Sequence, residues 1–248
     1  LEITGPSGAD IIKGGSGADA LRGGQGDDHL YAGDNDKLID GGNDADTAYF
    51  AASVSAKNLM DGDLINVETL TITGTGAYDF SAQSEKLVIT AAGVTGAVTI
   101  TGGKGADTLT GGSADDVIVA SDIDKIDGGD AADNDTVRFG AAVSKLNLLD
   151  DDLVDIDNIV ITNTKAASYD FSVQSEALNI AGGMGNDTIV LSSTDVINLD
   201  HDHGNRLLLP LGLGKLKREQ LVELATVVNA RQRINKAVAT QIFCLLAQ

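Results

Sequence analysis

Apolar and β-branched residues of this chain come in short runs separated by turn-forming residues, rather than in stripes with a helical period. Between residues 69 and 119 the runs recur about every ten residues. This spacing is typical of a β-solenoid, in which each side of a coil is one short strand and each coil stacks only on its neighbours. The runs are Thr69–Thr73, Lys86–Thr90, Ala97–Thr101, Thr108–Thr110 and Val117–Val119.

A nine-residue motif, Gly-Gly-x-Gly-x-Asp-x-apolar-x, is written several times between and beside these runs. Its glycines permit left-handed turns and leave room for backbone carbonyls to face a cation, and its aspartate supplies the hard anionic oxygen that calcium prefers. The motif therefore predicts a parallel β-solenoid with calcium between its coils. The full copies are Gly14–Arg22, Gly23–Tyr31, Gly102–Thr110 and Gly182–Val190, and degenerate copies begin at Gly5, Gly41 and Gly111.

These copies, three of them in unbroken tandem from Gly5 to Tyr31, resemble the RTX or haemolysin-type calcium-binding repeat of secreted bacterial proteins. The resemblance implies an all-β, right-handed parallel β-roll or β-solenoid. It also implies that the motif aspartates and the carbonyls of the glycine turns bind calcium between alternate repeats on one edge. The implied aspartates are Asp10, Asp19, Asp28, Asp46, Asp107, Asp116 and Asp187. Asp36 takes the same place if one residue is dropped before it, and Asp135 does so if two residues are added before it. The implied glycines are Gly14, Gly15, Gly17, Gly23, Gly24, Gly26, Gly102, Gly103, Gly105, Gly182, Gly183 and Gly185.

Some copies depart from the motif. Asp44 and Ala114 stand where the third glycine belongs, and Leu191-Ser192 replaces a Gly-Gly pair. Sites built from these turns should be weaker or empty. The alternative that a motif aspartate only closes an Asx-turn stays open, most of all for the isolated Gly182–Val190 copy.

A longer repeat of roughly ninety residues overlies the motif. The segment Tyr78–Leu87 matches Tyr169–Leu178, and each long unit holds a calcium island followed by a glycine-poor spacer that we expect to continue the stack without metal. The predicted segments are a calcium-binding β-roll at 1–50, a spacer at 51–101, a second island at 102–139, a duplicated spacer at 140–181, a truncated island at 182–204 and a basic helical tail at 205–248.

The net charge of -20 hides two different regions. Residues 1–204 carry 10 Lys and Arg against 35 Asp and Glu, whereas residues 205–248 carry 7 against 2. From Lys215 to Ala247 the apolar residues follow a step of three or four, which predicts an amphipathic helix. Two interpretations of this tail remain open: a helical cap or export signal, or an unrelated or fused sequence, because the repeat breaks off after Asp200.

The composition also argues against several classes of function. Strong acidity argues against nucleic-acid binding, and no apolar run is long enough for a membrane span. Cys244 is the single cysteine, so no disulfide can form within the chain, and metal ions are the remaining means of cross-linking the fold. No nucleophile elbow, zinc-protease or phosphate-loop motif is present, so we expect no enzyme. We expect a calcium-binding, secreted structural or adhesive region whose further partners are a cell surface or other copies. The resemblance to RTX repeats also implies export by a type I system. The alternative is the non-catalytic calcium module of an exported protease, lipase or polysaccharide-modifying enzyme.

Overall fold

The computed structural model describes residues 1–185, 187–192, 196–198 and 206–208. Within these ranges the regular structure is short β-strands, paired in parallel, with one 3-10 turn at Asp150–Asp152. The prediction of an all-β parallel solenoid is therefore confirmed, while the amphipathic helix predicted within 215–247 lies outside the described residues. The chain forms two compact units: unit 1 is Leu1–Arg138 with Asp152–Ile156, and unit 2 is Phe139–Asp151 with the residues from Asp157 onward.

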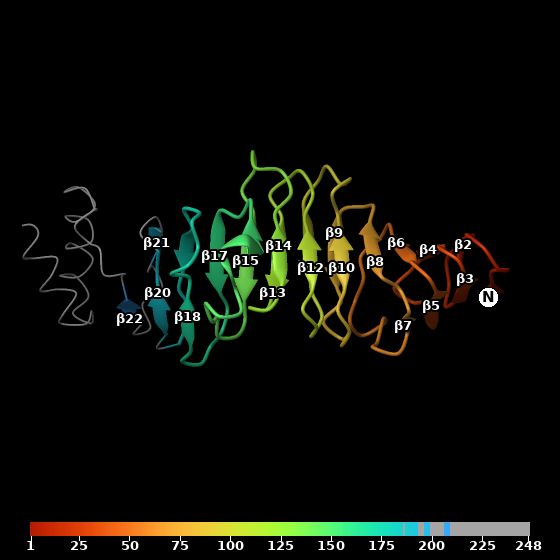
Figure 1. The fold of residues 1–248 in the computed structure, drawn as a ribbon, viewed down its shortest axis with the longest axis horizontal. Coiled ribbons are helices and arrows are strands. Elements are labelled where there is room, and N and C mark those ends of the chain that lie inside the picture. Colours follow the sequence, from red (N-terminus) through yellow and green to blue (C-terminus); the bar gives the residue numbers. More distant parts are fainter. Residues whose placement is uncertain (186, 193–195, 199–205, 209–248) are drawn as a thin grey trace, which may run out of the picture. The chain divides into compact units, whose positions relative to one another are not determined.

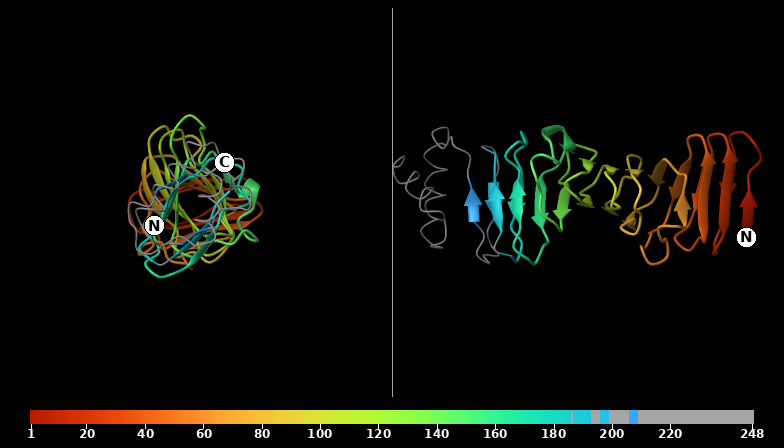
Figure 2. Two further views of the ribbon diagram at one scale, coloured as in Figure 1. Left: turned by 90° about the vertical axis from the view of Figure 1, so that its left-hand side faces the viewer. Right: turned by 60° about the horizontal axis from the view of Figure 1, so that its bottom comes forward.

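Unit 1 is a stack of coils whose strands form three parallel sheets (Figure 1). In the right-hand view of Figure 2 its red and orange N-terminal strands lie side by side along the stack. The first sheet contains β1 (Glu2–Thr4), β3 (Ala20–Gln25), β5 (Leu38–Asn43) and β7 (Leu64–Ile65). The second contains β2 (Ile11–Lys13), β4 (His29–Ala32), β6 (Thr47–Phe50), β8 (Thr69–Ile72), β10 (Val88–Thr90), β12 (Thr108–Thr110), β14 (Lys125–Asp127) and β16 (Leu153–Val154). The third contains β9 (Gly76–Asp79), β11 (Val98–Thr101), β13 (Val117–Ala120) and β15 (Thr136–Phe139), whose last residue belongs to unit 2.

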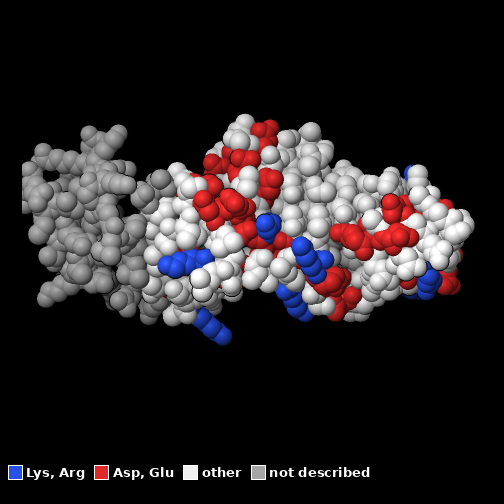
Figure 3. All heavy atoms as spheres, in the orientation of Figure 1, with Lys and Arg blue, Asp and Glu red and all other residues white. Residues whose placement is uncertain are grey.

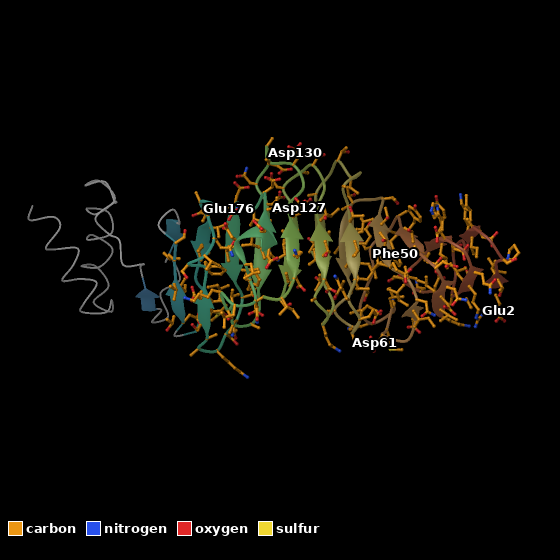
Figure 4. All side chains as sticks on the ribbon, viewed as in Figure 1. Glu2, Phe50, Asp61, Asp127, Asp130 and Glu176 are labelled. Atoms are coloured by element: carbon orange, nitrogen blue, oxygen red, sulfur yellow. The ribbon has the colours of Figure 1, made fainter. Side chains whose placement is uncertain are left out.

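The core of unit 1 consists of apolar rows that run along the stack. Alternation along each strand turns one apolar residue inward, and parallel pairing in register places it above the inward residue of the next coil. Phe50, at the end of β6, is labelled in Figure 4 and is fully buried. The longest row follows the second sheet through Ile12, Leu30, Ala48, Leu70, Ile89, Leu109, Ile126 and Leu153.

The first spacer continues the same parallel stack, as the spacing of its apolar runs predicts. Strand β8 pairs with β6 of the first island on one side and with β10 on the other. Strand β10 in turn pairs with β12 of the second island. The two calcium islands of unit 1 are therefore joined by an unbroken sheet and not by a flexible linker.

Unit 2 holds two parallel ladders of three strands. One contains β17 (Asn158–Ile161), β19 (Asn179–Ala181) and β21 (Val196–Asn198), and the other contains β18 (Ser168–Asp170), β20 (Thr188–Val190) and β22 (Arg206–Leu208). Buried Phe139 and Phe171 lie with ring centroids 6.0 Å apart in its core. Strand β22 falls in the segment predicted to begin the basic tail, so parallel pairing extends into that segment.

Candidate metal centre

The motif aspartates occupy one structural position, the last residue of a turn just before a strand. Asp28 precedes β4, Asp46 precedes β6, and Asp107 precedes β12. Their side chains are almost completely buried although they are acidic. The same holds for Asp19, Asp36, Asp116, Asp135 and Asp187, each at most 3% exposed, whereas Asp10 in the first coil is half-buried.

In the motif aspartates other than Asp10 and Asp19, one carboxylate oxygen accepts a backbone N–H from another coil. Oδ1 of Asp28 accepts a hydrogen bond from the backbone N–H of Asp10, and Oδ1 of Asp46 accepts one from Asp28, both at 2.8 Å. On another edge Oδ1 of Asp36 accepts the N–H of Asp19 at 3.0 Å. Each carboxylate therefore satisfies a backbone amide of the preceding coil that would otherwise lack a partner. In the same way Asp107, Asp116, Asp124, Asp135 and Asp187 accept from Leu87, Val98, Asp107, Asp116 and Ala167.

The second oxygen, Oδ2, divides the turns into two classes. In what we call closed turns, Oδ2 accepts a backbone N–H of its own turn, as Asp107 does from Gly103 at 2.7 Å. In open turns, Oδ2 is buried and has no hydrogen-bond donor among the described residues. The closed turns are those of Asp36, Asp107, Asp116 and Asp124, which accept from Gly33, Gly103, Gly112 and Ser121. Between residues 5 and 49 the open turns are those of Asp10, Asp19, Asp28 and Asp46.

Backbone carbonyls lie beside Oδ2 on one edge of the first island, which we define as residues 5–49. A Cβ added to Gly5 would lie 2.5 Å from the carbonyl oxygen of Gly23 and 2.6 Å from Oδ2 of Asp10. A Cβ on Gly23 would overlap the carbonyl oxygen of Gly41 in the same way, together with Oδ2 of Asp28. Gly5 directly follows β1, and Gly23 and Gly41 lie within β3 and β5. Each comes one residue after the paired residues Thr4, Arg22 and Asp40, so the three glycines form one column along the stack, the glycine column.

Other motif glycines are needed for a different reason. Gly15, Gly17, Gly24 and Gly26 have φ between 94° and 149°, as the motif predicts for left-handed turns. The prediction is wrong for the later copies, because Gly103, Gly105, Gly183 and Gly185 do not have a left-handed φ. A Cβ at these positions would instead press on the backbone of the preceding coil, for example at 2.9 Å from the carbonyl oxygen of Gln83 for Gly103 and 2.8 Å from that of Asn163 for Gly183. For Gly102 the nearest atom to a Cβ is Oδ2 of Asp107, at 3.0 Å.

The departure from the motif at Asp44 preserves the turn. Asp44 replaces a glycine and still has a φ of 81°, which Asn and Asp tolerate better than other side chains. Its carboxylate accepts the N–H of Gly26 at 3.1 Å, and Asp27 of that coil accepts the N–H of Ala45 at 3.0 Å. Paired aspartates therefore hold these two coils together at a site where the sequence predicts a weakened turn.

Burial sets the electrostatics of these carboxylates. Loss of hydration raises the pKa of Asp107 to about 6, against the lowering effect of the hydrogen bonds from Leu87 and Gly103. Burial, more than the nearby Asp133 carboxylate, raises the pKa of Asp135 to about 7. The pKa values of Asp36, Asp46, Asp116, Asp124 and Asp187 are also raised, in each case chiefly by burial.

These shifts predict an unusual pH dependence for the calcium-free protein. A carboxyl whose pKa is higher in the folded than in the unfolded state binds protons more tightly when folded. Stability should therefore rise as pH falls through about 7 and about 6 towards the unfolded value near 3.8. We expect the urea midpoint of calcium-stripped protein to be higher at about pH 5 than at about pH 7.5. In saturating calcium the urea midpoint should instead be lower at about pH 5 than at about pH 7.5, because protons compete with the cation for the same carboxylates. The same order of midpoints with and without calcium would contradict the assignment of these carboxylates as calcium ligands.

The donor set of the first island suits calcium. Calcium takes six to eight hard oxygens, at about 2.3–2.6 Å, from carboxylates and backbone carbonyls. Here buried Oδ2 atoms without a hydrogen-bond donor lie beside a column of carbonyl oxygens. Within the described part of the chain, no three acidic, histidine or cysteine side chains converge on one point. Most ligands would therefore be carbonyl oxygens, and calcium would supply positive charge to the buried carboxylates of Asp28 and Asp46.

Comparison with known proteins agrees with this donor set. The family model described as the RTX calcium-binding nonapeptide repeat (4 copies) matches residues 4–36, 14–48 and 90–118. The chain carries RTX calcium-binding repeats. This repeat family binds calcium. The first two RTX matches cover the open turns of Asp10, Asp19, Asp28 and Asp46. No curated protein and no solved structure matches the chain.

The structure adds site residues that the motif does not identify. Asp124 occupies a motif position, with its Oδ1 on the N–H of Asp107, although no nonapeptide begins before it. The segment Asp124–Gly129 (Asp-Lys-Ile-Asp-Gly-Gly) nearly repeats Asp36–Gly42 (Asp-Lys-Leu-Ile-Asp-Gly-Gly), and this internal likeness is the signal that would have found it. Glu68 also takes a motif position, because its Oε2 accepts the N–H of Asp46 at 2.7 Å.

Proposed function

We propose that this chain is a structural or adhesive segment of a secreted bacterial protein, and that its first island folds when it meets extracellular calcium. The observation that carries the proposal is the stack of open turns, whose buried carboxylates require a cation. Calcium is scarce in the cytosol and abundant outside the cell, so such a chain would stay unfolded during export and fold afterwards. RTX repeats are typical of secreted bacterial proteins, which supports this location and export by a type I system.

A structural rather than catalytic role is supported by the duplicated spacers. Buried Gln83 donates a hydrogen bond from Nε2 to the carbonyl oxygen of Leu59 at 3.1 Å. Its counterpart Gln174 donates to the carbonyl oxygen of Leu148, the residue equivalent to Leu59, at 3.4 Å and to that of Leu149 at 3.0 Å. The chain therefore repeats a detailed fold element that adds length to the stack and not a metal site. A module serving only as the calcium region of an exported enzyme would not need it.

The charged surface is consistent with a role outside the cell. On the face drawn in Figure 3, Asp and Glu are more prominent than Lys and Arg. Self-association or attachment to a cell surface would then depend on calcium to neutralise this charge. No helix of the described residues is long and apolar enough to cross a membrane.

The proposal is tested by locating the protein in cells that produce it from its complete gene. With about 1 mM calcium in the medium, we expect the protein in the cell-surface or medium fraction, and we expect a chelator wash to release the surface-bound part. A cytosolic marker protein controls for lysis. Retention of the protein in the cytosol would contradict the proposed location. A catalytic domain in the same reading frame would instead favour the enzyme-module alternative.

A further inference from the structure

Each calcium island of unit 1 is followed by a spacer, and the row of carbonyl oxygens along the glycine column continues into that spacer. Asp40 on β5 pairs with Ile65 on β7, so the next residues, Gly41 and Asn66, are in register (Figure 1). A Cβ on Gly41 would overlap the carbonyl oxygen of Asn66 and would lie 2.5 Å from Oδ2 of Asp46. A spacer residue thus presents its carbonyl at the place where Gly23 and Gly41 present theirs.

Asp46, the aspartate at this boundary, has the same burial and hydrogen bonding as Asp28 inside the island. Asp46 is 1% exposed, its Oδ1 accepts the N–H of Asp28, and its Oδ2 has no hydrogen-bond donor among the described residues. The carbonyl oxygen of Asn66 and Oδ2 of Asp46 both lie within 2.5 Å of one point beside Gly41. Calcium–oxygen distances of about 2.3–2.6 Å allow one ion to contact both atoms.

The backbone of the spacer is specially shaped to bring this carbonyl into place. Asn66 has a φ of 51°, one of three non-glycine residues with a positive φ in the described chain. A left-handed conformation is unfavourable for a residue with a side chain, and such outliers gather at functional sites. Its side chain donates a hydrogen bond from Nδ2 to the carboxylate of half-buried Asp40 at 2.9 Å.

The second island ends in the same way. Asp127 on β14 pairs with Val154 on β16, so Gly128 and Asp155 are in register, and Asp155 also has a φ of 51°. A Cβ on Gly128 would overlap both the carbonyl oxygen of Asp155 and Oδ2 of Asp135. Figure 4 labels Asp127 and Asp130, which flank Gly128 and Gly129 in this turn. The arrangement of Gly41, Asp46 and Asn66 therefore occurs twice.

We propose that each island of unit 1 carries a boundary calcium site outside the RTX motif, completed by a carbonyl oxygen of the spacer: Asn66 with Asp46 in the first island, and Asp155 with Asp135 in the second. This proposal rests on calcium binding by the open turns and extends it to residues that belong to no nonapeptide. The spacers thus supply the last ligands of the islands that they follow, and each island gains an ion at the coil where its repeats end.

The test counts calcium ions per full-length chain by native mass spectrometry. Asn66→Val should bind one ion fewer than the unmodified chain, because a β-branched residue cannot hold the left-handed turn. Asn66→Gly removes the side chain but keeps the carbonyl and the positive φ, so it should keep the full count. Asn58→Val is a matched control, since exposed Asn58 also donates from Nδ2 to an aspartate, Asp34, at 2.9 Å but has no positive φ; it should keep the full count.

The second boundary site keeps the proposal testable if Asn66→Val fails to fold by circular dichroism. Asp155→Val should also lose one ion, and Asp155→Gly should lose none. A full count in Asn66→Val or Asp155→Val would overturn the boundary sites while leaving the open turns in place. Loss of an ion in the glycine variants would overturn the assignment of the carbonyl as ligand. An unmodified chain that binds no calcium would instead contradict the proposed function itself.

Discussion

Removal of calcium from the full chain is expected to unfold residues 5–46 while leaving much of the spacer protected. Four carboxylates in this segment have a buried Oδ2 without a hydrogen-bond donor among the described residues, and those of Asp10, Asp28 and Asp46 follow one another in one column, where they would repel each other without a cation. Each ion at a tenfold excess of calcium over its Kd adds about 1.4 kcal/mol to stability. Several such ions approach the whole stability of a small domain, about 5–15 kcal/mol.

Hydrogen exchange followed by mass spectrometry measures this difference segment by segment. Peptides from 5–46 should lose protection in calcium-free buffer, whereas peptides from 86–110, whose Asp107 turn is closed by Gly103, should lose much less. Magnesium should not restore the first island, because it demands a smaller and near-octahedral oxygen shell. Equal protection of 5–46 with and without calcium would contradict the open turns as calcium sites.

Replacement of Asp28 is expected to have the second-largest effect. Asp28→Ala removes the Oδ1 that satisfies the N–H of Asp10 and the Oδ2 of an open turn at once. The orphaned amide alone costs about 1–3 kcal/mol, and at least one calcium ion should be lost with the carboxylate. Asp28→Asn separates the two tasks, because the amide oxygen still accepts the N–H while the charge is gone.

The comparison with Asp27 gives this prediction its control. Asp27 is the neighbouring residue, is more exposed, and makes one surface hydrogen bond to the N–H of Ala45. Calorimetric titration should show a lower calcium stoichiometry for Asp28→Asn and an unchanged one for Asp27→Asn. Equal losses in both variants would mean that calcium responds to the general acidity of the island and not to the motif register.

The fold was largely predictable because two repeats are visible in the sequence: the apolar runs about ten residues apart and the long unit of roughly ninety residues. A run such as Lys86–Thr90 is short and contains β-branched residues, and such runs recur about every ten residues, which predicts a short strand; strand β10 covers Val88–Thr90. The near-identity of Tyr78–Leu87 and Tyr169–Leu178 indicated equivalent elements, and both tyrosines are fully buried. The region around Arg206 was not predictable in this way, since no glycine motif introduces strand β22.

The division into open and closed turns could not be predicted from single copies of the motif. Gly23–Tyr31 and Gly102–Thr110 fit the same pattern, yet Asp28 is open and Asp107 is closed. The two copies differ in what surrounds their first glycine: a Cβ on Gly23 would meet the carbonyl oxygen of Gly41 in the next coil, whereas the nearest atoms to a Cβ on Gly102 belong to the side chains of Asp107 and Leu109. The partners come from a coil roughly eighteen residues away, so one nonapeptide does not contain the information.

The most direct test is a crystal structure of the full chain grown in calcium, with the ions located by their anomalous scattering. The account predicts peaks beside the glycine column, between the carbonyl oxygens of Gly23, Gly41 and Asn66 and Oδ2 of Asp10, Asp28 and Asp46. It predicts none at the closed turns of Asp36, Asp107, Asp116 and Asp124, where backbone N–H groups already occupy Oδ2. Ions at the closed turns, or a glycine column without ions in saturating calcium, would contradict it.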